Sequence, residues 1–186
     1  DEEDEPDLVQ AKIELDDLYE RRFARMNDFE KSTLLNFYKN YYLNIEDYPG
    51  AIGIFQQMLE IETLRADIRL RTHRSLGQLY ASEEDWQGSI DNYEQWRILS
   101  DTEDEIVYRG LSYAHYQLEN FEEAKPFWIA RMELLLDAGE TLEREDYSYL
   151  NGLYFTLEDF ESALDLTKTM IVLYDNQTDW QNLSAI

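Results

Sequence analysis

Few residues in this sequence could carry out catalysis. The chain has two histidines, His73 and His115, and no cysteine. The lack of cysteine excludes a thiolate nucleophile, zinc bound by thiolates, and disulfides. No HExxH zinc motif, Ser-His-Asp order, P-loop or glycine-rich turn occurs. We therefore predict that the protein is not an enzyme and holds no cofactor.

Carboxylates are the remaining candidates, because clusters of them can bind divalent cations. The acidic cluster Glu103-Asp104-Glu105 lacks the spacing and the central glycine of an EF-hand loop. Any Ca²⁺ binding there would be weak and fortuitous. No metal site is predicted, and the two histidines are better explained by their places in a repeated helical unit.

That unit is the main pattern of the chain. An Asp or Asn, an aromatic residue, two further residues and an Ala or Ser occur in this order four times. The instances are Asp47-Tyr48…Ala51, Asp85-Trp86…Ser89, Asn120-Phe121…Ala124 and Asp159-Phe160…Ala163, so that the small residues lie 38, 35 and 39 positions apart. A period of this length indicates a stack of small helical units. Such a stack usually works through its surface, which favours a binding or scaffolding protein.

Further positions agree when the four units are aligned on these small residues. Thirteen positions upstream lie Tyr38, Leu76, Leu111 and Leu150, and nine upstream lie Tyr42, Tyr80, His115 and Tyr154. This order resembles the tetratricopeptide repeat (TPR), a helix-turn-helix unit of about 34 residues. The resemblance implies an all-α fold, a right-handed superhelical solenoid. The usual closing proline is absent, and the longer spacings imply longer connections near 62–67 and 138–143.

Local physics supports the same unit. The Asp or Asn is suited to cap the second helix, because its side-chain oxygen can accept an unpaired backbone N–H. Pro49 falls in the first turn, where a missing N–H costs little. The Ala or Ser should lie where the two helices of a unit cross. His115 replaces the aromatic residue of the unit and His73 replaces a large one, so both are predicted to pack rather than to bind a metal.

The pattern also predicts boundaries along the chain. Residues 1–7 form an acidic leader that we expect to be disordered, and 8–31 form an N-terminal helix or helix pair with Leu15, Leu18, Phe23, Met26 and Phe29 as apolar candidates. The solenoid covers 32–186, with repeats near 32–66, 70–103, 105–142 and 144–176. Residues 177–186 begin a fifth repeat, in which Trp180 and Leu183 match the start of a first helix. An open end there could mediate self-association.

The composition of the chain restricts the kinds of partner that it can bind. The chain has 41 acidic against 16 basic residues and a net charge of −25. Such a chain is repelled by nucleic acids and by anionic lipid, so neither is predicted as a partner. No apolar run reaches the roughly 18 residues needed to span a membrane. The acidity indicates either solvated outer faces or attraction to a basic partner, and we retain both interpretations.

The first helix of each unit is expected to line a concave groove. The candidate protein- or peptide-binding residues are Asn36, Asn40, Arg71, Arg74, Gln78, Arg109, Tyr113, Tyr116 and Tyr149. The full set of inward positions adds Phe37, Asn44, Ser75, Gln117, Glu145, Ser148 and Phe155, and so contains three arginines but one acid. Amides, arginines and tyrosines suit an extended peptide. The alternative is that some of the tyrosines pack against neighbouring repeats.

One known binding mode of TPR proteins can be tested on these positions. Domains that grip the C-terminal carboxylate of heat-shock chaperones use Lys and Asn in the first unit, Asn in the second, and Lys and Arg in the third. Asn40 matches the first Asn, whereas the other four positions hold Asn36, Ser75, Ile106 and Gly110. That clamp is therefore absent, although the three arginines could form a different anion site.

Several phrases go beyond the generic repeat. They are Met26-Asn-Asp-Phe-Glu-Lys leading to Asn36-Phe-Tyr, Asp47-Tyr-Pro-Gly-Ala-Ile, Tyr113-Ala-His-Tyr-Gln-Leu-Glu-Asn-Phe and Asp179-Trp-Gln-Asn-Leu-Ser. Together they resemble gammaproteobacterial periplasmic TPR proteins encoded beside TonB, ExbB and ExbD homologues. The resemblance implies a periplasmic adaptor for a TonB-type energy-transducing transport system. The alternative is a cytoplasmic TPR scaffold or co-chaperone without the carboxylate clamp.

Overall fold

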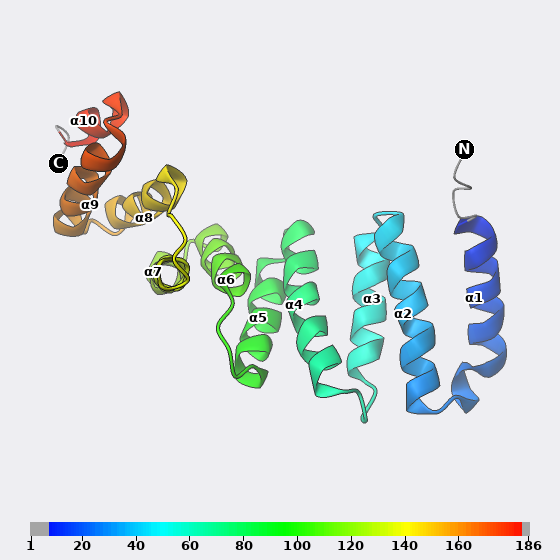
Figure 1. Ribbon diagram of the computed structural model, residues 1–186. Coiled ribbons are helices and arrows are strands. Elements are labelled where there is room, and N and C mark those ends of the chain that lie inside the picture. The colour runs from blue at the N-terminus through cyan, green and yellow to red at the C-terminus, as the bar shows by residue number, and fades with distance from the viewer. Residues whose placement is uncertain (1–7, 184–186) are drawn as a thin grey trace. The chain divides into compact units, whose positions relative to one another are not determined.

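The computed structural model describes residues 8–183 of the chain (Figure 1). All regular elements in this range are helices, which confirms the all-α prediction. The chain divides into two compact units, 1–100 and 101–186, and each is described by itself. The predicted disordered leader, residues 1–7, lies outside the described residues.

The first unit begins with a helix that precedes the repeats. Its elements are α1 (Leu8–Arg22), the short 3₁₀ helix η1 (Phe23–Arg25), α2 (Asp28–Asn44), α3 (Tyr48–Leu59), α4 (Ala66–Ser82) and α5 (Trp86–Leu99). Helices α2 and α3 pack as one hairpin and α4 and α5 as another, while α1 packs on α2 and α3 packs on α4. The buried core of this unit includes Leu35 and Leu76.

The second unit repeats the same arrangement. Its elements are α6 (Glu105–Gln117), α7 (Phe121–Asp137), α8 (Arg144–Thr156), α9 (Phe160–Tyr174) and α10 (Gln177–Leu183). The hairpins are α6 with α7 and α8 with α9, while α7 also packs on α8 and α10 packs on α9. Trp128 and Leu153 belong to the core between α7 and α8.

The turn inside each hairpin has one geometry throughout. The residue before the Asp or Asn is always a glutamate in the left-handed conformation: Glu46, Glu84, Glu119 and Glu158, with φ of 57–60°. The N–H of the next residue then donates back to the carbonyl of the residue five positions earlier, at 2.9 Å in every turn. This is the Schellman helix ending, which satisfies carbonyls left over at the end of the first helix.

The predicted caps form at three of the four turns. The carboxylate of Asp47 accepts from the N–H of Gly50, and Asp85 and Asp159 accept in the same way from Gly88 and Ser162. Asn120 makes no such side-chain hydrogen bond. Pro49 lies in the first turn of α3, as predicted. The Asp-aromatic pattern therefore starts the second helix through local bonds that need no tertiary contact.

The small residues lie where the helices of each hairpin cross. Ala51, Ser89, Ala124 and Ala163 are all completely buried. The crossing of α4 and α5 is especially close, because a Cβ added to Gly77 would lie 2.7 Å from the ring of Tyr93. A larger side chain at these positions would separate the two helices.

Several boundaries differ from those predicted. Helix α2 begins at Asp28 rather than near 32, because Asn27 and Glu30 form a capping box. Residues 28–31 therefore belong to α2, and Phe29 is 80% exposed instead of lying in a core. Helix α4 begins at Ala66, four residues before the predicted 70, and the connection from α3 therefore runs over residues 60–65.

The beginning of a fifth unit is also built differently from the prediction. A helix does form there, α10, but its Trp180 is 52% exposed whereas Asp179 is buried at 1% exposure. The carboxylate of Asp179 accepts a 2.6 Å bond from Arg144 at the start of α8. The contacts that tie α10 to its neighbours are thus polar: this ion pair and a 3.1 Å bond from the indole N–H of Trp180 to the carboxylate of Asp175 at the end of α9.

Candidate functional site

A groove between α2 and α4 brings together three of the five candidates in the first unit. Asn36 and Asn40 line it from α2 and Arg71 lines it from α4, and its volume is about 560 Å³. The two asparagines lie four positions apart, so they project from one face of α2. Ser75, one turn after Arg71, completes the α4 side. We call this hollow the α2–α4 groove.

Lys39 is a further residue of this groove that the sequence analysis did not select. It lines the same hollow, and its Nζ donates a 2.7 Å bond to the side-chain oxygen of Asn36. Burial of the ammonium group, and secondly the positive charge of Arg71, lower the pKa of Lys39. Its position three residues after Asn36, on the same helix face, could have revealed it from the sequence.

The acidic residues around this groove are already paired or hydrogen-bonded within the protein. Asp67 pairs with Arg71 at 2.9 Å and with Arg65 at 3.0 Å, so one carboxylate is shared by two guanidinium groups. The carboxylate of Asp28 accepts from the hydroxyl of Thr63, and this bond lowers the pKa of Asp28. The α2–α4 groove therefore retains a net positive charge, although Arg71 is not a free cation.

The other two candidates of the first unit lie on α4 but do not line this groove. Arg74 is half-buried and Gln78 is exposed. The carbonyl of Gln78 accepts from the hydroxyl of Ser82 within the helix. Their assignment to a binding surface remains a prediction.

The candidates of the second unit lie on α6 and α8. Arg109 is exposed on α6, and Tyr113 and Tyr116 are 45% and 38% exposed on the same helix. The ring of Tyr116 packs on Phe121 and Tyr149, with centroids 5.2 and 5.5 Å away. Tyr113 and Arg109 thus lie on the surface of this unit.

Tyr149 is held by packing and by hydrogen bonds. Its ring centroid lies 4.0 Å from that of Trp128, and its hydroxyl donates to the backbone oxygen of Ser112 at 3.3 Å. Burial raises the pKa of Tyr149 to about 12. These contacts match the alternative interpretation of the tyrosines, in which they hold neighbouring helices together.

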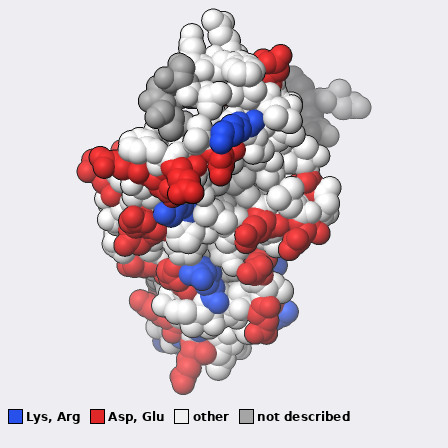
Figure 2. All heavy atoms as spheres, turned by 90° about the vertical axis from the view of Figure 1, so that its left-hand side faces the viewer, with Lys and Arg blue, Asp and Glu red and all other residues white. Residues whose placement is uncertain are grey.

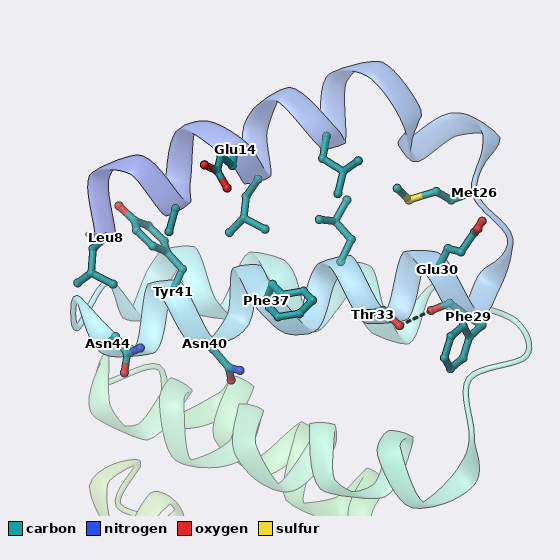
Figure 3. A pocket seen from close by; sticks show the side chains of 14 residues that line it. Leu8, Glu14, Met26, Phe29, Glu30, Thr33, Phe37, Asn40, Tyr41 and Asn44 are labelled. Atoms are coloured by element: carbon teal, nitrogen blue, oxygen red, sulfur yellow. Dashed lines mark hydrogen bonds between the residues drawn. The ribbon is translucent and has the colours of Figure 1, made fainter. Parts of the chain in front are cut away.

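A second hollow lies on the opposite flank of α2, against α1. Its volume is about 600 Å³, and Phe29, Thr33 and Asn40 line it as well as the α2–α4 groove. Figure 3 shows Phe37 and Tyr41 projecting from α2 and Glu14 projecting from α1 into this space. We call it the α1–α2 hollow, and Asn40 stands at the ridge that separates the two.

Neither histidine lies in a site with catalytic or metal-binding character. His73 Nδ1 is 3.1 Å from the side-chain oxygen of Asn92, and the ring of His115 stacks on Phe127 with centroids 5.7 Å apart. Across residues 8–183 no group of three or more His, Asp or Glu side chains could hold a metal ion. Within the same range no helix has the length and apolar character required to cross a membrane.

The surface of the molecule is acidic. In the face that Figure 2 shows, acidic side chains are spread widely and the basic side chains occur singly among them. Against this background the α2–α4 groove stands out, because Lys39, Arg65 and Arg71 line it and Asp28 is its sole acidic lining residue among those described.

No protein-family model matches the chain, and no curated protein matches it in sequence. Solved structures do match. The crystal structure of the MamA protein has a TM-score of 0.63 at 18% identity and covers 83% of this chain and 79% of its own. YrrB, a TPR protein with an unusual peptide-binding site, has a TM-score of 0.62 at 14% identity. The match covers 96% of this chain and 81% of YrrB.

A putative kinesin light chain of Podosopora anserina with TPR-like repeats matches at a TM-score of 0.61 and 14% identity, covering 89% of this chain and 84% of its own. At such low identities the likeness establishes the fold, which is a TPR-like helical solenoid.

Proposed function

We propose that this protein is a non-enzymatic adaptor that binds an extended segment of another protein along the α2–α4 groove. The observation that carries the proposal is the pair of cations in that groove. Lys39 has no carboxylate partner among the described residues, and it lies close enough to Arg71 for their repulsion to lower its pKa. A carboxylate of a bound segment would relieve this repulsion, because it would lie between two positive charges.

The amides beside these cations suit an extended backbone. Asn36 and Asn40 each offer a side-chain donor and acceptor, and both face the groove from α2. Lys39 already uses the oxygen of Asn36, so this amide presents its N–H₂ to a ligand. The segment would thus be held by its backbone at the asparagines and by one acidic group at the cations.

We further propose that the protein works in the periplasm and that its partner is a component of a TonB–ExbB–ExbD system. The support for both points is the set of sequence phrases that resemble periplasmic TPR proteins encoded beside such systems. A cytoplasmic scaffold or co-chaperone is the competing function. The carboxylate clamp that would mark a chaperone-binding TPR domain is missing at four of its five positions, so the sequence supplies no specific observation in favour of this function.

The test is crosslinking in the organism that encodes the protein, followed by capture of the full chain from the envelope fraction. The groove variant is Lys39→Ala with Arg71→Ala. The matched control is Arg21→Ala with Lys168→Ala, which removes the same charge from exposed ion pairs outside the groove. Capture of TonB-system proteins by wild type and the control, but not by the groove variant, is the expected result.

Two other results would each reject one part of the proposal and keep the rest. Equal capture by all three proteins would keep the partner and reject the groove. Capture of cytoplasmic chaperones, together with recovery of the protein in the cytoplasmic fraction, would reject the periplasmic TonB role and support the competing function.

A further inference from the structure

The α1–α2 hollow differs in chemistry from the groove on the other flank of α2. Most of its lining residues are apolar, and Leu15 and Leu34 form part of it. Two aromatic rings from α2 are left largely in solvent around it, since Phe29 is 80% and Phe37 is 56% exposed. Exposed rings beside an apolar hollow are unusual on a monomer surface and indicate a place where a partner binds.

The charges of this hollow are negative. Its charged lining residues are Glu14 and Glu30, and no lysine or arginine lines it. Glu14 accepts a hydrogen bond from the neutral amide of Gln10, and Glu30 accepts one from the backbone N–H of Asn27. Neither bond neutralises the carboxylate, so a positive group placed at the mouth of the hollow would be stabilised.

We propose that the α1–α2 hollow is a second anchor, which takes a bulky apolar side chain next to a lysine or arginine of a partner protein. The proposal rests on the adaptor function to the extent that the ligand is a protein segment. Charge complementarity selects this occupant over others. A second copy of a chain with net charge −25 would be repelled, and the carboxylate of a fatty acid would face Glu14 and Glu30.

The protein's own residues 1–7 are disfavoured for the same reason. Their sequence is DEEDEPD, which offers no bulky apolar side chain and no positive charge. Burying an aromatic or leucine side chain from a partner is favourable because it removes apolar surface from water. A segment of that acidic composition would lose this contribution and would add repulsion.

The positions of the two hollows also predict the order of residues along the ligand. Phe29, Thr33 and Asn40 line both hollows, so one segment can cross α2 and occupy both. A helix with side chains is about 10 Å across, and an extended chain advances about 3.3 Å per residue. The ligand therefore carries its apolar and basic residues about three or four positions away from an acidic residue, which lies at Lys39 and Arg71.

The test is to pan a phage library of random peptides on the full chain and to measure the enriched peptides by fluorescence anisotropy. We expect them to combine a Phe, Leu or Trp with a neighbouring Lys or Arg. Phe37→Ser should weaken their binding about tenfold or more, as loss of a central aromatic anchor does. Glu14→Lys should weaken it about threefold, and this effect should shrink at high salt.

The matched control is Ile13→Ser. Ile13 is 56% exposed on α1 and does not line the hollow, so its variant should bind as wild type does. Because Phe37 and Ile13 are equally exposed, neither change should unfold the protein, and circular dichroism checks this. Equal weakening by both variants would overturn the proposal, as would a library that yields no enriched peptide.

Two further outcomes separate this proposal from the adaptor function. Peptides that lose binding with Lys39→Ala and Arg71→Ala, but not with Phe37→Ser, would overturn the second anchor and leave the groove standing. Concentration-dependent oligomers of wild type that Phe37→Ser abolishes and Ile13→Ser keeps would show that a second copy fills the hollow, and would also overturn it.

Discussion

The hydroxyl of Ser89 donates a 2.8 Å hydrogen bond to the backbone oxygen of Gly77, at the point where α4 and α5 cross. Both residues are buried, and the bond forms because neither has a side chain large enough to keep the helices apart. The same crossing in the other hairpins is made by alanines. The spacing of the two helices in a unit is therefore set by small residues at one place.

Gly77→Ala tests this spacing directly. The added Cβ would lie 2.7 Å from ring carbons of Tyr93, a buried side chain, so the helices must shift. We expect a loss of about 1–3 kcal/mol in the free energy of unfolding, measured with urea. Gly53→Ala is the control, because a Cβ there meets nothing within 4 Å and α3 should gain about 0.5–1 kcal/mol. Equal stability of the two variants would contradict the argument.

The pKa of Lys39 should lie below its usual value of 10.5, chiefly because its ammonium is buried and secondly because Arg71 repels it. Between the lowered pKa and 10.5 the unfolded chain binds the extra proton, so the contribution of Lys39 to stability rises with pH there. The affinity for an acidic peptide should fall over the same range, since the ammonium is lost. NMR titration of the lysine side chains measures this pKa.

Arg71→Met supplies the comparison for that titration. It removes the repulsion by Arg71, which is the smaller of the two causes of the lowered pKa, and leaves the burial of the ammonium. The pKa of Lys39 should therefore return part of the way toward 10.5. A Lys39 that titrates at 10.5 or above in the wild-type protein would contradict the description of the groove.

Arg131 should stabilise the second unit through two carboxylates on other helices. Its guanidinium donates to Asp146 on α8 at 2.6 Å and to Glu105 on α6 at 3.1 Å, and its side chain is 11% exposed. Arg131→Met would leave buried charge unpaired, so we expect a loss of about 3 kcal/mol in urea unfolding. Lys168→Met, which breaks an exposed pair, should cost less than about 1 kcal/mol. Equal losses would show that burial adds nothing to these pairs.

Replacing a left-handed glutamate by glycine should stabilise the fold. Glu119 has φ of 60°, which glycine adopts without the steric cost of a Cβ. Glu119→Gly is expected to raise the free energy of unfolding by about 0.5–1 kcal/mol in thermal or urea unfolding. Glu133→Gly, in the exposed interior of α7, should instead lower it by about 1 kcal/mol. A loss at both positions would refute this account of the turn.

The sequence by itself determined the helical repeat, the hairpin caps and the crossings. These features depend on residues close in the chain, such as Asp85 and Gly88, or on a side-chain size that recurs in every unit, as at Ala51 and Ala163. Local hydrogen bonds and periodic packing leave such marks directly in the order of residues. The all-α class and the TPR-like fold followed from them.

The candidate site was predictable in part. Asn36, Asn40 and Arg71 meet in one groove, because a helix register places residues four apart on one face. The register cannot show what each side chain meets on the next helix. The pairing of Arg71 with Asp67, the burial of Lys39 and the packing of Tyr149 against Trp128 all depend on that neighbour.

Tertiary structure also decided where the apolar surface lies. Phe29 looked like a core residue, but the capping box at Asn27 starts α2 early enough to turn this ring into solvent. The α1–α2 hollow exists because α1 packs on α2 without covering Phe29 and Phe37. Which face of a helix remains uncovered depends on how its neighbours pack, and the order of residues in one helix does not contain that information.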